Sequence, residues 1–332
     1  MKRLLPILSA FALVAASGAA HAQAKSEISI TRQPGILYLA SHVMEKKKLV
    51  EAEAAKLGVA NLKVTWPILA GGGAQTDALL SGNVDVVNTG TGNLLLLWDR
   101  TRGRVRGIVA SSAQPVILLT RDPKIKSLSD YGPGDKIAVP TVGVSTQAIL
   151  LQMAAIKMFG EAKVNHFDPM TVQLSHPDAM ALVLGGQGEV ASHFSAPPFQ
   201  YVGIKRGLRQ VITSKEIIGG PLSQAQFFTT TQYAEANPVV VKALRQATAA
   251  AIAFIKSNTT EAIEIYKEIT GDKTDSAELA DIMKQPDMMD FIMDPQGTMK
   301  FAEHLFKIGT LKTMPKAWTD YYLPTSADLK GS

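Results

Sequence analysis

The sequence contains no cysteine, and this absence excludes several classes of protein. Without a Cys among its 332 residues, the chain cannot form disulfide scaffolds, Cys-ligated zinc sites, iron–sulfur clusters, c-type haem attachments or thiol nucleophiles. The lipid-anchored cysteine of a bacterial lipoprotein is excluded as well. Aromatic residues are few, at 6%, whereas 46% of the residues are hydrophobic, which is typical of an α/β protein. Because single cores stop growing at roughly 250 to 300 residues, the length predicts two lobes.

The first residues have the pattern of a secretory signal peptide. Lys2 and Arg3 precede an apolar run over residues 4–16, and Ala20 and Ala22 form an A-x-A cleavage site. The run is shorter than the roughly 20 apolar residues that span a bilayer. Cleavage after Ala22 removes two of the positive charges behind the net charge of +5, so we expect no nucleic-acid partner. We expect an exported protein of the periplasm.

Strand-like and helical patterns then alternate, joined by glycine-bearing turns. Strands are predicted at residues 27–31, 62–69 and 84–88, and helices at 37–57, 74–81 and 93–101. This order predicts a mostly parallel sheet. Beyond residue 237 the pattern is helical, with helices expected at 238–257, 259–269, 276–283 and 298–308.

The second half of the chain repeats the first. Gly82 and Val86 match Gly186 and Val190 at a shift of 104 positions. Two copies predict two α/β lobes, joined by strands near residues 105–120 and 211–231 that cross between them. The expected domains are a signal peptide (1–22), lobe 1 with the carboxy-terminal helices (23–113 and 222–332) and lobe 2 (114–221).

Five segments at predicted strand ends or helix starts are expected to meet in a cleft between the lobes. Taken singly, each is explained by turn and cap chemistry, but their recurrence in both copies makes them candidates for a site. Their backbone N–H groups and hydroxyls suit a small polar or anionic ligand. Apart from Arg32 they carry no Lys or Arg, so a neutral heterocycle would fit equally well. The candidate ligand-binding residues are Gln33, Pro34, Gly35, Gly72, Gly73, Thr89, Gly90, Thr91, Ser145, Thr146, His193 and Phe194.

His193 is the most informative single residue, because it ends a predicted strand and matches Thr89 in the repeat. It could hydrogen-bond a ligand while Phe194 stacks on it, or it could cap the following helix. Four other histidines are interpreted as structural or solvated: His42, His166, His176 and His304.

No catalytic set is assembled by the motifs. The GVSTQ segment around Ser145 lacks the closing glycine of a nucleophile elbow, and GGGA around Gly72 lacks the Lys-Ser/Thr of a P-loop. No His pair has the i, i+4 spacing with Glu that binds zinc. We therefore expect no catalytic residue, no metal and no cofactor.

Four segments in order carry a resemblance to a known family: ILYLASHVMEKKKLVEAEAAKLG, GGGAQTDALLSGNVDVVNTGTG, KIAVPTVGVSTQAILLQ and HPDAMALVLGGQGEVASHFSAPPFQ. Together with the signal and the helical tail, this order resembles the nitrate/sulfonate/taurine-type solute-binding proteins of ABC importers. That family also includes relatives that bind thiamin-precursor pyrimidines. The resemblance implies a type II periplasmic binding-protein fold, a cleft that closes on one small molecule, and delivery to a membrane permease with its ATPase.

Two departures from the family pattern bear on the ligand. Many members have an acid and a proline after the last strand of the second copy, whereas Ser195 is followed by Ala-Pro-Pro with no acid. The eukaryotic pyrimidine-synthesising relatives are cysteine-rich near their active site, and this chain has no cysteine.

The function expected from the sequence is that of a non-catalytic, monomeric periplasmic receptor. Its ligand is expected to be a small organic anion or a small heterocycle, handed to an ABC permease. Two alternatives stay open: an exported enzyme that acts on a small heterocycle with His193 as acid or base, and a sensory receptor of the same fold that docks on a kinase.

Overall fold

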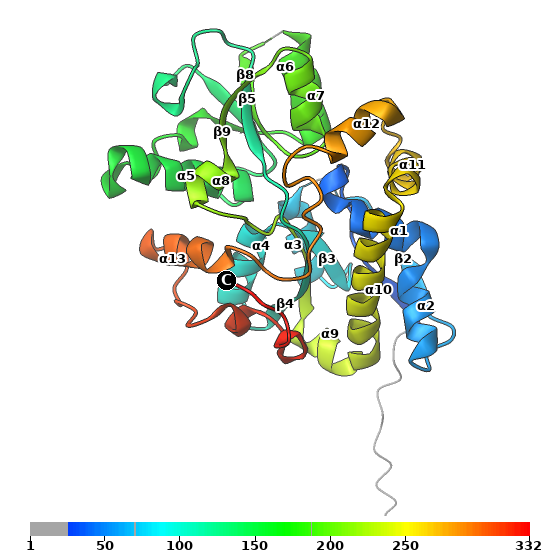
Figure 1. Ribbon diagram of the computed structural model, residues 1–332. Helices are drawn as coiled ribbons and strands as arrows, with labels where there is room; N and C mark the ends of the chain where they lie inside the picture. The colour runs from blue at the N-terminus through cyan, green and yellow to red at the C-terminus, as the bar shows by residue number, and fades with distance from the viewer. Residues whose placement is uncertain (1–25, 70, 187) are drawn as a thin grey trace, which may run out of the picture.

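The computed structural model describes residues 26–69, 71–186 and 188–332. The predicted signal peptide, residues 1–22, lies outside the described residues. The described residues form two α/β parts, one above the other in Figure 1.

One part is built on strands β1 to β4 and β10. Strands β1 and β2 are parallel, and β10 lies antiparallel between β3 and β4. A bridge between Ile30 and Val86 joins the two groups, which gives the order β2-β1-β3-β10-β4. The strands are β1 (Glu27–Ser29), β2 (Lys63–Thr65), β3 (Val86–Thr89), β4 (Val105–Ser112) and β10 (Ala225–Thr230).

The other part holds a sheet in the order β7-β6-β8-β5-β9. Strand β6 is parallel to β7 and β8, and β5 is antiparallel to β8 and β9. Order and direction therefore match the first part strand for strand, and the predicted internal repeat is confirmed. The strands are β5 (Ile117–Thr120), β6 (Lys136–Val139), β7 (Thr171–Gln173), β8 (Val190–Ser195) and β9 (Arg209–Thr213).

The chain crosses between the two parts twice. It leaves the first part after β4 to enter the second as β5, and it returns after β9 to enter the first as β10. Strands β5 and β10 hold equivalent places in the two sheets. The two predicted crossing segments are thus present, whereas the lobe boundaries at 113/114 and 221/222 stay a prediction.

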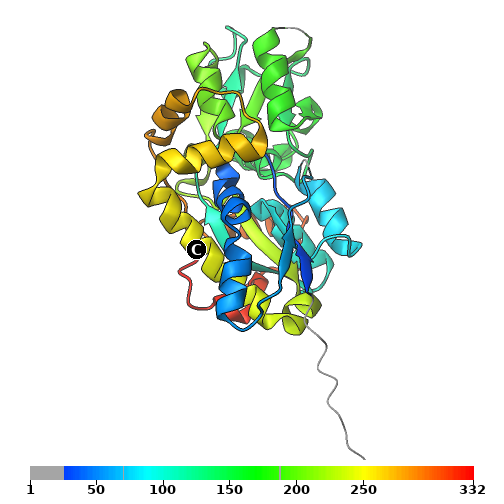
Figure 2. The same cartoon turned by 90° about the vertical axis from the view of Figure 1, so that its right-hand side faces the viewer.

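Helices cover both sheets (Figures 1 and 2). Helices α5 to α8 belong with the second sheet, and α1, α2, α10 and α11 pack together beside the first. Helix α10 is long and apolar enough to cross a membrane, but it buries Ala243, Ala247 and Ala251 in the core. The helices are α1 (Leu39–Lys47), α2 (Leu49–Lys56), α3 (Gly72–Leu80), α4 (Thr91–Arg100), α5 (Thr146–Phe159), α6 (His176–Gly185), α7 (Phe199–Lys205), α8 (Ser214–Ile218), α9 (Thr231–Ala236), α10 (Pro238–Ser257), α11 (Thr259–Thr270), α12 (Ser276–Met283) and α13 (Thr298–Lys307).

The helix predicted over residues 37–57 is two helices, so that prediction is wrong. Lys48, between α1 and α2, has a left-handed backbone with φ 48° and ψ 44°. The break lets Val50 and Ala54 of α2 bury against helix α10. Because the apolar spacing continues across residue 48, the pattern gave no sign of the break.

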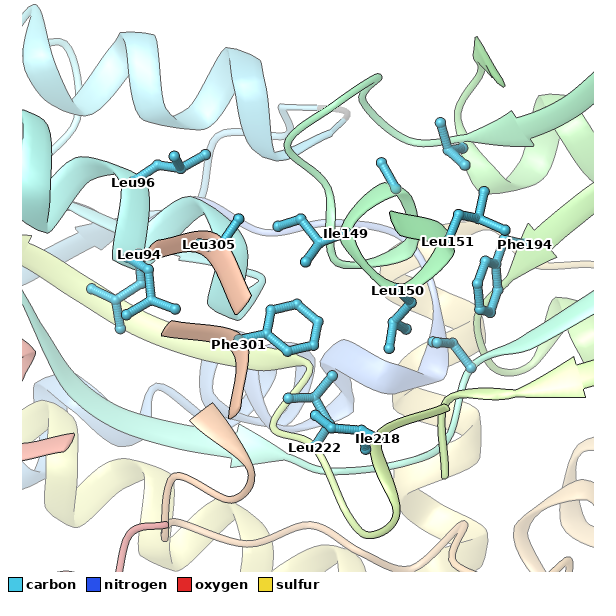
Figure 3. Close-up of a cluster of buried hydrophobic side chains, with 14 of the residues drawn as sticks. Leu94, Leu96, Ile149, Leu150, Leu151, Phe194, Ile218, Leu222, Phe301 and Leu305 are labelled. Carbon is cyan, nitrogen blue, oxygen red and sulfur yellow. The ribbon is translucent and has the colours of Figure 1, made fainter. Parts of the chain in front are cut away.

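One hydrophobic cluster extends across both parts. In Figure 3, Leu94 of α4, Ile149 of α5, and Phe301 and Leu305 of α13 lie in the same cluster. Helices α4 and α5 are in direct contact. This packing places the N-termini of α4 and α5, one from each part, beside the same space.

Candidate functional site

A small cavity of about 30 Å³ lies between the two parts. Its walls come from the first part and the second alike, whereas a larger hollow of about 440 Å³ is lined by residues 79–85 and 230–237 of the first part alone. The residues that line the cavity are Gln33, Leu37, Tyr38, Gly72, Thr89, Gly90, Asn93, Pro140, Ser145, Thr146, Gln147, His176 and Gln224.

Four helices begin at the cavity. Helices α3 and α6 start at Gly72 and His176, and α4 and α5 start directly after Gly90 and Ser145. Both α3 and α4 follow a glycine N-cap and make no side-chain cap bond. At α5 and α6, by contrast, serine side chains cap one first-turn N–H group each, and the first turn of α6 also contains Pro177 and the Asp178 carboxylate. Because a helix N-terminus carries roughly half a positive charge, the uncapped starts of α3 and α4 contribute most. The cavity therefore has a positive potential supplied by the backbone.

No charged side chain lines this cavity among the described residues. Its two titratable groups are Tyr38 and His176, and burial keeps both neutral. Burial lowers the pKa of His176 to about 4 and raises the pKa of Tyr38, with the hydrogen bond to Gln33 opposing. The helix termini are thus the main source of positive charge at the site.

Gln33 is held rigidly at the cavity wall. Its Nε2 donates to the Tyr38 hydroxyl at 2.8 Å and to the Asn88 carbonyl at 3.1 Å, and its Oε1 accepts from the Gly71 N–H at 3.3 Å. Its carbonyl oxygen lies 3.0 Å from His42 Nε2. Burial lowers the pKa of His42 to about 3, so His42 is neutral and donates to that carbonyl. Gln33 therefore joins the end of the first strand to the start of α3.

His176 and His193 form a direct pair. His176 Nδ1 lies 2.8 Å from His193 Nε2, and His176 Nε2 lies 3.3 Å from Gln147 Nε2. His193 is fully buried, and burial, with the neighbouring His176, places its pKa well below the ordinary value. His176, interpreted from the sequence as structural or solvated, lines the cavity, whereas His193 contacts His176 and is outside the cavity wall. Ligand binding by His193 stays a prediction.

Two buried polar atoms of the cavity wall have no hydrogen-bond partner among the described residues. They are the Thr146 hydroxyl oxygen of α5 and the Gln224 Nε2 of the segment before β10. Buried polar atoms are nearly always paired. Unpaired atoms from opposite parts of the molecule are suited to a polar ligand between them.

Glycine is required at Gly90 because the two parts approach each other closely there. A Cβ at Gly90 would lie 2.5 Å from the Thr146 hydroxyl oxygen of the opposite part. A Cβ at Gly72 would lie 2.0 Å from Asn93 Nδ2. Both glycines were predicted site residues, and the structure shows that any larger residue would collide with the cavity wall.

The structure brings half of the predicted ligand-binding residues to the cavity. These are Gln33, Gly72, Thr89, Gly90, Ser145 and Thr146.

Three of the other predicted residues lie near the cavity but outside its wall. Gly35 faces the Pro197 carbonyl, and Gly73 faces Thr141. The Thr91 hydroxyl donates to the Ser223 carbonyl at 2.6 Å, which ties α4 to the second crossing segment.

Pro34 and Phe194 lie elsewhere. Pro34 lines a separate groove between α6, α7 and α11. Phe194 is fully buried in the core near Leu150 and Leu151 (Figure 3). Because adjacent strand residues point to opposite faces, Phe194 lies on the other side of the strand from His193, in the core. This position does not favour the predicted stacking of Phe194 on a ligand.

Several wall residues were missed by sequence reasoning. Tyr38, Asn93 and Gln147 lie in the first helical turn after a predicted helix start. Including the first turn of each such helix among the candidates would have found them. Gln224 lies in a crossing segment with no local signal. The missed residues are Leu37, Tyr38, Asn93, Pro140, Gln147, His176 and Gln224.

Comparison with known proteins identifies the fold. No family model and no curated protein matches the sequence. Among solved structures, the alkanesulfonate-binding protein SsuA from Xanthomonas axonopodis pv. citri, bound to MOPS, matches with a TM-score of 0.70 and 15% identity, over 89% of this chain and 98% of that chain. A Candida albicans protein with the generic periplasmic binding protein fold matches with a TM-score of 0.63 and 12% identity, over 92% of this chain and 98% of that one. This chain has the periplasmic binding protein fold.

The nitrate-binding protein NrtA from Synechocystis PCC 6803 matches as well, with a TM-score of 0.66 and 17% identity, over 91% of this chain and 83% of that chain. The predicted α/β, type II periplasmic binding-protein fold is confirmed, and so, at the level of fold, is the resemblance to sulfonate- and nitrate-binding proteins. Within this fold, the cavity described above lies between the two lobes.

Proposed function

We propose that the protein is the periplasmic solute-binding component of an ABC importer and that its ligand is a small anion of the sulfonate or nitrate kind. The observation that carries this proposal is the convergence of four helix N-termini, of which α3 and α4 have no side-chain cap, on a cavity whose described lining residues include no charged side chain. The protein acts without catalysis, as a monomer, and passes its ligand to a membrane permease that works with an ATPase.

The charge distribution favours an anion over other ligands. Backbone N–H groups at helix N-termini bind oxyanions without help from Lys or Arg. The described residues of the cavity wall offer no carboxylate to a cationic ligand. The likeness in fold to proteins that bind an alkanesulfonate and nitrate supports the same class. A neutral heterocycle would gain less from the helix termini and is the second choice.

Ligand entry requires the lobes to separate. The cavity of about 30 Å³ is far smaller than the clefts of roughly 300–1,000 Å³ that usually hold small-molecule ligands. We assign residues 23–113 and 222–332 to one lobe and 114–221 to the other, with the two crossing segments as the hinge. A ligand favours the closed form only by as much as it contacts both lobes better there.

The location follows from the predicted signal peptide. Cleavage after Ala22 would release the protein into the periplasm, where the permease of the importer can be reached. A permease and an ATPase encoded beside this gene would support import, whereas a neighbouring sensor kinase would favour the sensory alternative.

Calorimetric titration of the purified protein tests the proposal. The ligands are nitrate, methanesulfonate and taurine, with a neutral pyrimidine as the comparison. We expect at least one anion to bind more tightly than the pyrimidine and to be recovered unchanged. Tighter binding of the pyrimidine would contradict the anion assignment, and turnover of any ligand would contradict the receptor role.

A further inference from the structure

Two histidines at the cavity, His176 and His193, bear on the protonation state of the site. His176 is the first residue of α6 and lines the cavity, and its Nδ1 lies 2.8 Å from Nε2 of the buried His193. The His176 ring also stacks on Phe199, with 6.3 Å between centroids and 20° between planes. The ring is thus fixed in orientation, with one nitrogen toward His193 and the other toward the cavity side.

The contacts of the pair define its protons. Gln147 Nε2 donates to His176 Nε2 at 3.3 Å, so this nitrogen carries the lone pair and Nδ1 carries the hydrogen. His176 Nδ1–H then donates to His193 Nε2, which leaves the hydrogen of His193 on Nδ1, a buried atom without a partner among the described residues. Both rings are neutral in this arrangement, and the lone pair of His176 Nε2, which accepts the Gln147 N–H, becomes available to a proton when Gln147 turns or leaves it.

Among the described residues, the groups that contact the pair from other elements are uncharged. Gln147 faces it from α5 and Phe199 from α7, and strands β5 and β6 pair with His193 through Leu119 and Ala138. Among the described residues that line the cavity, Tyr38 is the one other titratable group. On the pair's own helix, Asp178 is the charged group of the first turn of α6, two residues after His176. The adjoining groove that Pro177 lines holds Arg206 of α7 and Asp272 after α11, with the Tyr266 hydroxyl beside Asp272.

We propose that the His176–His193 pair takes up one proton from solvent when an anion binds in the cavity. This inference rests on the proposed function. The proton goes to His176 Nε2, which then donates a hydrogen bond to the anion. Gln147, whose amide nitrogen contacts His176 Nε2 in the empty site, either turns its amide oxygen toward that nitrogen or moves away from it. His176 Nδ1–H keeps its bond to His193, which acts as a positioning residue. The anion thereby meets one full positive charge that the empty site does not hold.

The direction of the pH dependence follows from this exchange. Burial keeps the pKa of His176 at about 4 in the empty site, and an anion within a few ångströms raises it. At a pH between the His176 pKa of the empty site and that of the complex, the complex holds a proton that the free protein lacks. The dissociation constant should therefore fall about tenfold for each unit by which the pH is lowered in that window, and it should be constant above it.

Titration with methanesulfonate, which stays an anion at every pH used, tests the proposal. Calorimetry between pH 5.5 and 8.5, in buffers of different ionisation enthalpy, measures proton uptake together with Kd. We expect uptake approaching one proton at the acidic end. His176→Gln should abolish the uptake and make Kd independent of pH, and His193→Asn should move the pH profile to lower pH. The matched control His166→Gln, whose ring contacts Phe159 and Phe167 away from the cavity, should keep both.

Negative results distinguish the proton-uptake proposal from the proposed anion-receptor function. If the wild-type protein binds methanesulfonate with no proton uptake and a constant Kd, the proton-uptake proposal is overturned while the anion receptor stands. If no anion binds at any pH, both are contradicted. Should His176→Gln fail to fold, imidazole ¹⁵N shifts of the wild-type protein at acidic pH decide the matter: two neutral rings in the complex overturn the proposal, and one imidazolium supports it.

Discussion

At the scale of single residues, the most telling feature is a pair of unsatisfied polar atoms. The Thr146 hydroxyl and the Gln224 amide are buried in the cavity wall without partners among the described residues. Leaving a buried polar group unpaired costs about 1–3 kcal/mol. A binding site explains this cost, because a ligand supplies the missing partners.

Thr146→Val should therefore separate binding from stability. The change keeps the shape but removes a hydroxyl that stabilises nothing in the unliganded protein. We expect an unchanged or slightly higher melting temperature and an affinity for the anion about tenfold weaker, which corresponds to roughly 1.4 kcal/mol.

Thr101→Val is the matched control. The Thr101 hydroxyl donates to the Leu97 carbonyl at 2.6 Å and accepts from the Val105 N–H at 3.0 Å, away from the cavity. This variant should lose about 1 kcal/mol of stability and keep its affinity. Equal affinity of Thr146→Val and the wild-type protein would show that Thr146 does not contact the ligand.

At the scale of elements, the break between α1 and α2 gives a prediction about stability. Lys48 holds a left-handed backbone, which costs a residue other than glycine about 1–2 kcal/mol. Lys48→Gly should raise the free energy of unfolding by about 1 kcal/mol. Ala52→Gly, on the exposed side of α2, should lower it by a similar amount. Thermal or urea unfolding measures both, and a destabilised Lys48→Gly would show that the helix does not break there in solution.

The contact between α4 and α5 gives a second prediction at this scale. A Cβ at Gly92 would lie 2.8 Å from the Val144 carbonyl and 2.4 Å from Ile149 Cδ1 of the opposite part. Gly92→Ala should push the two helix starts apart at a cost of about 1–3 kcal/mol, and so weaken anion binding about tenfold or more.

Gly134→Ala is the control for that experiment, since nothing lies within 4 Å of a Cβ at Gly134. Its affinity should equal that of the wild-type protein. An unchanged affinity in Gly92→Ala would contradict the close approach of α4 and α5 in the ligand-bound form.

The elements also show what the sequence could predict. Period-two and helical spacing, with glycine at the turns, located the strands and most helices, because each depends on local apolar patterns. The break at Lys48 could not be predicted, since it depends on how α2 packs against α10, a helix distant in sequence. Phe194 was predicted at the cavity together with its neighbour His193. Because neighbouring strand residues point to opposite faces, only one of these two side chains can face the cavity.

At the scale of the whole molecule, the repeat explains the site. Both copies place helix N-termini at strand ends, and the crossing strands β5 and β10 hold equivalent places in the two sheets. The sequence patterns predicted the two-lobed fold and six of the thirteen wall residues. It could not predict that His176 reaches the cavity or that Gln224 joins the wall, because both depend on how the lobes meet.

A crystal structure of the protein with methanesulfonate tests the central claim most directly. We predict that the sulfonate lies between the lobes, beside Gln33, Thr146 and His176, with its oxygens in hydrogen-bonding distance of first-turn N–H groups of α3, α4, α5 or α6 and of no Lys or Arg. An anion bound by charged side chains in a hollow of one lobe alone, with the cavity between the lobes left closed, would contradict the account.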